Sequence, residues 1–134
     1  MKTKAVIEMA KDGRFGIYTP DLKITTIIGS GSTVAEAKAD FENSVVEMFD
    51  CYMETNGELP DELNGVEFVY KYDIASFLEY YKFINVSQLA KVLGINPSLM
   101  RQYKKGQHIS EKRVKKIQEV INSVGKELAE IEFI

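Results

Sequence analysis

The sequence has no tryptophan, a single cysteine and a single histidine among its 134 residues. One cysteine cannot close a disulfide within the chain, which suits a reducing compartment. Cys51 lies beside the apolar residues Phe49 and Tyr52 in a segment with helical spacing, so we expect it to fill part of a core. A thiol nucleophile needs an activating base, and the only histidine, His108, falls in the other half of the chain. We therefore do not expect cysteine-based catalysis.

Long hydrophobic runs are also missing. No segment approaches the roughly 18 consecutive apolar residues that span a bilayer. The first residues, Met1 to Lys4, lead straight into an alternating segment and not into the apolar stretch of a signal peptide. The hydrophobic fraction of 45% is ordinary for a globular protein and too high for a disordered one. These features predict a globular, cytoplasmic protein.

Charge is divided unevenly along the chain. Residues 1–72 contain seven Lys and Arg against thirteen Asp and Glu, a balance of −6, whereas residues 73–134 contain ten against seven, a balance of +3. Within residues 91–116 eight basic residues stand against one acid, Glu111. An acidic half joined to a basic half indicates two roles, with a polyanion as the partner of the basic half. On charge alone, solvated surface lysines explain the pattern equally well.

The first half reads as a small sheet. Residues 4–10 and 14–19 are β-prone and flank Asp12-Gly13, a dipeptide typical of hairpin turns because glycine accepts a positive φ. Residues 24–28 predict a third strand, which we expect Gly29-Ser30-Gly31 to end.

A long helix and a last strand complete this half. Thr33, with Glu36 three residues later, predicts a capping box. Apolar residues then recur every three or four positions, at Val34, Ala37, Phe41, Val45, Met48 and Tyr52, which predicts an amphipathic helix. Asn56-Gly57 should stop it, and residues 66–72 alternate like a fourth strand. The predicted class is α+β, with a β-β-β-α-β domain over residues 1–72 and one helix on one face of the sheet.

From Asp73, a candidate cap for a helix over 74–82, the spacing becomes helical. We therefore predict an all-α domain over residues 73–134. Ser87 should cap a short helix with Leu89, Ala90 and Leu93 on its buried side, and Gly94 should provide a sharp turn. A small alanine suits two helices that cross closely.

A second helix should follow this turn directly. Asn96 is a good N-cap, and Pro97 suits the first helical position because its missing N–H costs nothing there. Met100 and Tyr103 should face inward. The outward residues are Ser98, Leu99, Arg101, Gln102, Lys104 and Lys105. A third helix near residues 110–124 should place Val114, Ile117, Ile121 and Val124 inward.

The alternative is an ordinary helical hairpin, since glycine in a helical turn is common. Here Ala90, Gly94-Ile95, Asn96-Pro97 and a polar, basic outer face occur together. This combination is typical of a helix-turn-helix that binds duplex DNA.

Residues 85–124 resemble the lambda-repressor or Xre type of helix-turn-helix, through Leu89-Ala90, Leu93-Gly94-Ile95 and the later Gly106. The resemblance implies that the second helix enters the major groove. It implies base contacts at Pro97, Ser98 and Gln102, with Arg101 adjacent and Lys104 available beside them. It implies phosphate contacts at Lys105, Gln107 and His108. Pro97 departs from the polar residue usual at its position, which leaves the register of base contacts open.

The first half resembles the HicB family of antitoxins. The matching residues are Asp12-Gly13-Arg14-Phe15, Pro20-Asp21-Leu22 and Gly31-Ser32-Thr33-Val34-Ala35-Glu36-Ala37. Lys23-Ile24-Thr25-Thr26 departs from the Gly-Cys-type segment usual in the family. The resemblance implies a truncated ribonuclease-H-like fold that binds a small basic RNA-cleaving toxin (HicA-like). It also implies a DNA-binding half that represses its own operon, with no cofactor and no metal.

Two other interpretations remain open. An active nuclease would need several carboxylates around two metals, and Glu8 is the one strand acid that could face a pocket, so we do not expect an enzyme. A stand-alone transcription regulator could use the first half to sense a ligand or to assemble. Repressors of this type generally work as dimers. Residues 128–134 alternate, which fits either an interface strand or a packed or frayed tail.

Overall fold

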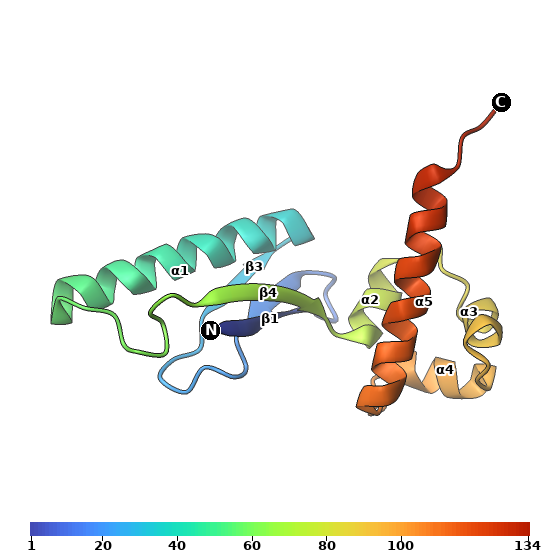
Figure 1. Ribbon diagram of the computed structural model, residues 1–134, viewed down its shortest axis with the longest axis horizontal. Helices are drawn as coiled ribbons and strands as arrows, with labels where there is room; N and C mark the ends of the chain where they lie inside the picture. The colour runs from blue at the N-terminus through green and yellow to red at the C-terminus, as the bar shows by residue number, and fades with distance from the viewer. The chain divides into compact units, whose positions relative to one another are not determined.

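A computed structural model describes all residues from Met1 to Ile134 and contains a four-stranded sheet and five helices (Figure 1). The protein is of the mixed α+β class. The chain forms two compact units, Met1–Phe77 and Leu78–Ile134. The predicted boundary lay at residues 72–73, and the observed one falls inside helix α2 (Ile74–Tyr80). The N–H of Met9 donates to Ser76 Oγ at 3.1 Å, which ties the start of α2 to the first unit.

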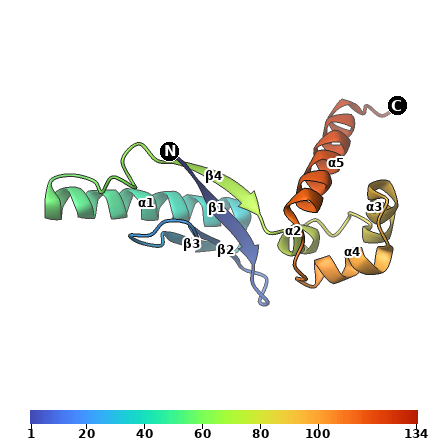
Figure 2. The ribbon, with the colours of Figure 1, turned by 60° about the horizontal axis from the view of Figure 1, so that its bottom comes forward.

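The first unit follows the predicted order of elements. These are β1 (Lys2–Met9), β2 (Phe15–Tyr18), β3 (Ile28–Gly31), α1 (Val34–Asn56) and β4 (Glu67–Tyr72). The sheet order is β3-β2-β1-β4, with β4 parallel to β1 and the other pairs antiparallel. Helix α1 lies along one face of this sheet, and no other helix of the unit covers the opposite face (Figure 2).

The predicted hairpin between β1 and β2 is confirmed. Gly13 has a φ of 86°, and its N–H donates to the carbonyl of Ala10 at 2.9 Å. The carboxylate of Asp12 accepts from the N–H of Arg14 at 2.9 Å. Asp-Gly therefore closes the turn through the positive φ that glycine permits.

The predicted third strand over residues 24–28 is wrong, because β3 begins only at Ile28. The N–H groups of Lys23 and Ile24 donate to the carboxylate of Glu62, at 2.7 and 3.0 Å. Thr19 Oγ1 accepts from the N–H of Ile27 at 2.9 Å. Side chains thus satisfy backbone groups that a strand would have paired with its neighbour, and the β-prone composition is overridden.

Gly29-Ser30-Gly31 was predicted to follow the third strand, but these residues form most of β3, whose last residue is Gly31. A Cβ on Gly31 would lie 2.6 Å from the Cβ of Glu36, and one on Gly29 would collide with the backbone nitrogen of Phe41. The missing side chains let α1 approach β3 closely, which is a common role of glycine in a strand.

Helix α1 begins as predicted. Thr33 Oγ1 accepts from the N–H of Glu36 at 3.1 Å, while the Glu36 carboxylate accepts from the N–H of Ser32 at 2.8 Å. The helix buries its face toward the sheet through Val34, Ala37 and Phe41. The predicted core position of Cys51 is wrong, since its side chain is exposed.

The second unit contains the rest of α2, then α3 (Val86–Leu93), α4 (Pro97–Lys104) and α5 (Glu111–Glu130). Its core consists of Leu78, Leu89, Ala90, Leu93, Met100, Tyr103 and Ile117. The cap of α3 is Asn85, whose Oδ1 accepts from the N–H of Gln88 at 3.0 Å. The prediction that Ser87 caps this helix is therefore wrong by two positions.

Helix α5 is longer than the predicted 110–124. Residues Leu128–Glu130 are helical and 131–134 have no regular structure, so the interface strand considered for residues 128–134 is wrong. Of the residues expected to face inward, Ile117 is buried, but Val114 and Val124 are 36% and 40% exposed. No helix of the protein is long and apolar enough to cross a membrane.

Candidate nucleic-acid interface

The turn between α3 and α4 has the predicted geometry. Gly94 adopts a left-handed conformation with φ of 72°, and the N–H of Ile95 donates to the carbonyl of Ala90 at 3.0 Å. Ala90 has no exposed surface, as expected of a small residue where two helices lie close together. Asn96 Oδ1 accepts from the N–H of Ser98 at 2.8 Å, and Pro97 occupies the first turn of α4. Local sequence therefore determines where α4 begins.

Helix α4 has one buried and one exposed side. Met100 and Tyr103 are buried, as predicted, while Ser98, Arg101 and Gln102 are exposed on the other side. The Tyr103 hydroxyl accepts from Arg113 Nη1 at 2.8 Å, which links the buried side of α4 to α5. The polar outer side of α4 takes no part in the core.

Arg101 is oriented by two hydroxyl groups. Its guanidinium donates to Ser98 Oγ at 3.2 Å and is 3.5 Å from Ser87 Oγ. Ser87, predicted as a cap, instead lies beside the outer side of α4. Asparagine is also a good N-cap residue, so Asn85 in the sequence could have been recognised as an alternative cap to Ser87.

Other predicted site residues differ in their surroundings. Lys104 Nζ lies 3.9 Å from the carboxylate of Glu79, so this lysine is engaged with α2 and is half-buried. Pro97 is also half-buried. Lys105, Gln107 and His108 are exposed. The N–H of Gln107 donates to the carbonyl of Gln102 at 3.1 Å, which folds the loop back over the end of α4.

The electrostatics of the second unit favour an anionic partner. The unit contains ten Lys and Arg against six Asp and Glu, a balance of +4, whereas the first unit has seven against fourteen, a balance of −7. Neither Arg101 nor Lys105 has a carboxylate within 4.0 Å. The cations on the outer side of α4 and at its end thus remain available.

No three His, Cys, Asp or Glu side chains lie close enough to hold a metal ion. Glu8 accepts from the hydroxyl of Tyr18 at 3.0 Å. Burial, together with the hydrogen bond to Glu8, raises the pKa of Tyr18 above its usual value of 10.0.

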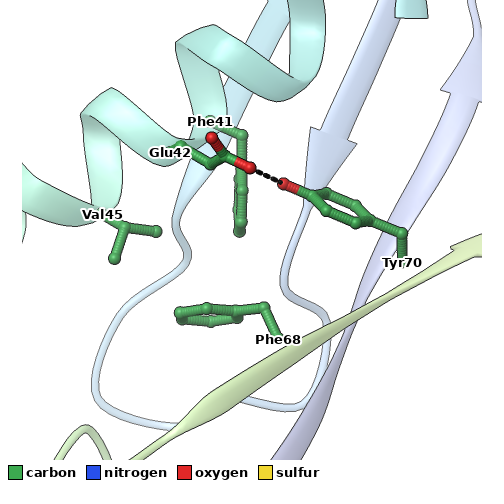
Figure 3. Close-up of a pocket in the computed structure, with 5 residues that line it drawn as sticks. All are labelled: Phe41, Glu42, Val45, Phe68 and Tyr70. Carbon is green, nitrogen blue, oxygen red and sulfur yellow. Dashed lines mark hydrogen bonds between the residues drawn. The ribbon is translucent and has the colours of Figure 1, made fainter. Parts of the chain in front are cut away.

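The first unit also has a small pocket of about 230 Å³ between α1 and β4. Figure 3 shows Phe41, Glu42 and Val45 from the helix facing Phe68 and Tyr70 from the strand. The Tyr70 hydroxyl donates to the Glu42 carboxylate at 3.1 Å. Burial and this hydrogen bond raise the pKa of Tyr70 to about 12.

Comparisons with known proteins found no similar protein. A scan against protein-family models found no match, and searches of curated proteins and of solved structures found none either.

Proposed function

We propose that the protein is an antitoxin and transcriptional autorepressor. Its second unit binds operator DNA through α3 and α4, and its first unit binds a small basic RNA-cleaving toxin of the HicA type. The observation that carries the proposal is the outer side of α4, where Arg101 and Gln102 are exposed without an ionic partner, while Met100 and Tyr103 anchor the helix from within.

The chemistry of this side suits the major groove of DNA. Gln102 can bond adenine through two hydrogen bonds, and Arg101 can do the same with guanine. The hydroxyls of Ser87 and Ser98 already hold the arginine, which lowers the entropy lost when it binds a base. Lys105 and the exposed loop after it would contact phosphates, which supply affinity without sequence choice. Lys104 contributes less, because Glu79 already engages it.

A dimer of this repressor is supported by α5. Beyond the buried Ile117, the helix carries Val124 and Leu128 four residues apart, exposed at 40 and 55%, and Ile131, exposed at 51%, follows directly after its end. This is the spacing of residues that pack between two helices. A Cβ on Gly125 would have no neighbour within 4 Å. No close approach within the unit therefore explains why a glycine stands in the interior of this helix. A second copy packed here would present two α4 helices to adjacent half-sites.

The toxin half of the proposal rests on charge and on the order of elements. The first unit carries a balance of −7, which would steer and mask a basic partner. Its β-β-β-α-β order is the one that the resemblance to HicB proteins implies. The pocket between α1 and β4, at about 230 Å³, is smaller than the roughly 300–1,000 Å³ of most small-molecule sites, so this pocket does not itself support a ligand-sensing role.

The DNA half is tested by substitutions on α4. Replacing Gln102 or Arg101 with Ala should weaken binding to the DNA upstream of the protein's own coding sequence by about 1–3 kcal/mol and relax its sequence preference. Fluorescence anisotropy with the upstream fragment and a scrambled fragment measures both effects. Lys126→Ala on α5 is the control for loss of one positive charge. If both α4 variants bind the operator like the unaltered protein, α4 is not the recognition helix.

The toxin half is tested by coexpression. The reading frame adjacent to this gene should encode a small basic protein that arrests growth when expressed alone and is neutralised by this protein. Co-purification of the two should persist in the Gln102→Ala variant, because the toxin site lies in the first unit. An adjacent product that neither binds this protein nor arrests growth would contradict the antitoxin role and leave a stand-alone regulator.

A further inference from the structure

Strand β4 leaves one edge of the sheet unpaired. It is the outermost strand of the order β3-β2-β1-β4, and β1 is its only neighbour. The N–H of Glu67 donates to the carbonyl of Met1, and the N–H of Asp73 donates to the carbonyl of Ile7. Amide groups alternate in direction along a strand, so the N–H groups of Phe68 and Tyr70 face the open edge. Such an edge is a template for another strand.

The side chains beside this edge are also incompletely covered. Phe68 and Tyr70 lie on the α1 face of the sheet and line the pocket with Phe41 and Val45 (Figure 3). Phe68 meets the ring of Phe41 edge to face at 5.4 Å, yet both β4 aromatics are only partly buried. A strand added outside β4 would cover their remaining surface and satisfy their backbone groups together.

The sequence of β4 is complementary to itself when a second copy is placed antiparallel. With Val69 opposite Val69 of the second copy, Glu67 stands opposite Lys71, and Phe68 stands opposite Tyr70. This register pairs an acid with a base twice and an aromatic ring with an aromatic ring twice, and each kind of cross-strand pair is stabilising. It also matches residues whose amides both face the edge, as an antiparallel hydrogen-bonded pair requires.

The neighbouring registers lose this complementarity. Moving the second copy so that Tyr70 faces Tyr70 places Glu67 opposite Asp73, which sets two acids against each other. Moving it so that Phe68 faces Phe68 places Lys71 opposite Gly65 and removes the charge pairing. One register is therefore favoured over its neighbours.

We propose that β4 is a homodimer interface, in which two copies of this chain pair antiparallel about Val69 and join their four-stranded sheets into one continuous sheet. The interface has two-fold symmetry, the commonest arrangement in homodimers. It is independent of DNA binding and of α5. A chain that self-associates through both β4 and α5 forms assemblies larger than a dimer. Molecular mass alone therefore does not tell the β4 contact from the α5 contact.

Hydrogen exchange of individual amides provides the direct test on the full-length protein. The amides of Phe68 and Tyr70 should exchange slowly at high protein concentration and speed up on dilution. The amides of Val69 and Lys71, which face β1, should stay protected throughout and serve as internal controls. If Phe68 and Tyr70 exchange at unprotected rates at every concentration, or are protected only when another protein is present, the self-pairing proposal is wrong.

Charge reversal tests the register. Lys71→Glu should weaken self-association at β4 about tenfold, because it places like charges opposite each other twice, and Glu67→Lys should do the same. The double variant should recover the unaltered affinity, since the pairs are only exchanged. Lys11→Glu, at the β1–β2 turn, is the charge control. Association is measured from the concentration dependence of Phe68 and Tyr70 exchange, with circular dichroism to confirm folding. A double variant as weak as the single ones would exclude this register.

Discussion

The two units bring a helix close to a neighbouring element by different means. In the first unit the approach of α1 to β3 depends on Gly29 and Gly31, where a side chain would meet the helix backbone or Glu36. In the second unit α3 packs beside α4, Ala90 of α3 is fully buried, and the chain reverses at Gly94. A new methyl group that collides with helix backbone cannot be accommodated by a side-chain rotation, whereas one that meets other side chains can be. The first unit should therefore be the less tolerant of an added methyl group.

The units also use their charged groups differently. Carboxylates of the first unit accept backbone N–H groups of the same unit, as Asp12, Glu36, Asp40 and Glu62 do. On α4 of the second unit, Arg101 is held only by hydroxyls, and Lys105 has no ion pair. Many acids of the first unit thus stabilise its fold, while the cations at α4 are left for a partner. Substitution of these charged residues should accordingly affect stability in the first unit and binding in the second.

The largest effect is expected from Gly29→Ala. The new Cβ would collide with the backbone of Phe41, so the free energy of unfolding should fall by at least about 3 kcal/mol. Gly16→Ala in β2 is the matched control, because a Cβ there meets nothing within 4 Å. Urea unfolding followed by circular dichroism measures both. Equal effects at the two glycines would contradict the close approach of α1.

In the second unit, Ala90→Leu should cost about 1–3 kcal/mol of stability through overpacking. The larger side chain would also displace α4 and weaken DNA binding. Val92→Leu on the same helix, where the side chain is 65% exposed, should change neither property appreciably. If Ala90→Leu unfolds the protein as readily as Gly29→Ala does, the contrast between side-chain and backbone contacts fails.

A smaller effect on binding is expected from Lys105→Ala. Loss of one phosphate contact should weaken binding to all duplexes alike and reduce the slope of log affinity against log salt by about 0.9. Gln102→Ala should leave that slope unchanged, since it alters a base contact. Titrations of each variant at four salt concentrations measure the difference. If Lys105→Ala has the same salt slope as the unaltered protein, Lys105 does not contact a phosphate.

The smallest effect concerns Glu62 in the first unit. The N–H groups of Lys23 and Ile24 lower the pKa of this carboxyl below its usual value. A lowered folded-state pKa stabilises the fold above the unfolded pKa, and this contribution is lost as pH falls through the folded value. Glu62→Gln should therefore lose less stability than the unaltered protein between neutral and acidic pH. Glu58→Gln is the control, and a steeper pH dependence in Glu62→Gln would contradict the two hydrogen bonds.

The sequence predicted those structural features that are determined by contacts between residues close together in the chain. The α4 cap at Asn96, the turn at Gly94 and the hairpin at Gly13 follow from neighbouring residues, and each was predicted. The start of β3 depends on Glu62, a distant residue, and was missed. The roles of Gly29 and Gly31 depend on a helix that passes over them, which spacing cannot reveal.

Two features of the second unit show the same limit. Residues 128–134 alternate like a strand, but Val124, Leu128 and Ile131 also continue the helical spacing of α5, and the helix prevails as far as Glu130. Lys104 was grouped with the outward cations of α4, although Glu79 on another helix engages it. The direction of a long side chain near a helix end depends on what packs beside it.

The measurement that tests the central claim most directly is a footprint of the full-length protein on the DNA upstream of its own coding sequence. The proposal predicts protection of two half-sites whose centres lie about one helical turn, roughly 10 base pairs, apart. Protection should be lost in Gln102→Ala at concentrations where Lys126→Ala still protects. No protected sequence at any concentration below that of non-specific binding, or equal protection by both variants, would contradict DNA reading by α4.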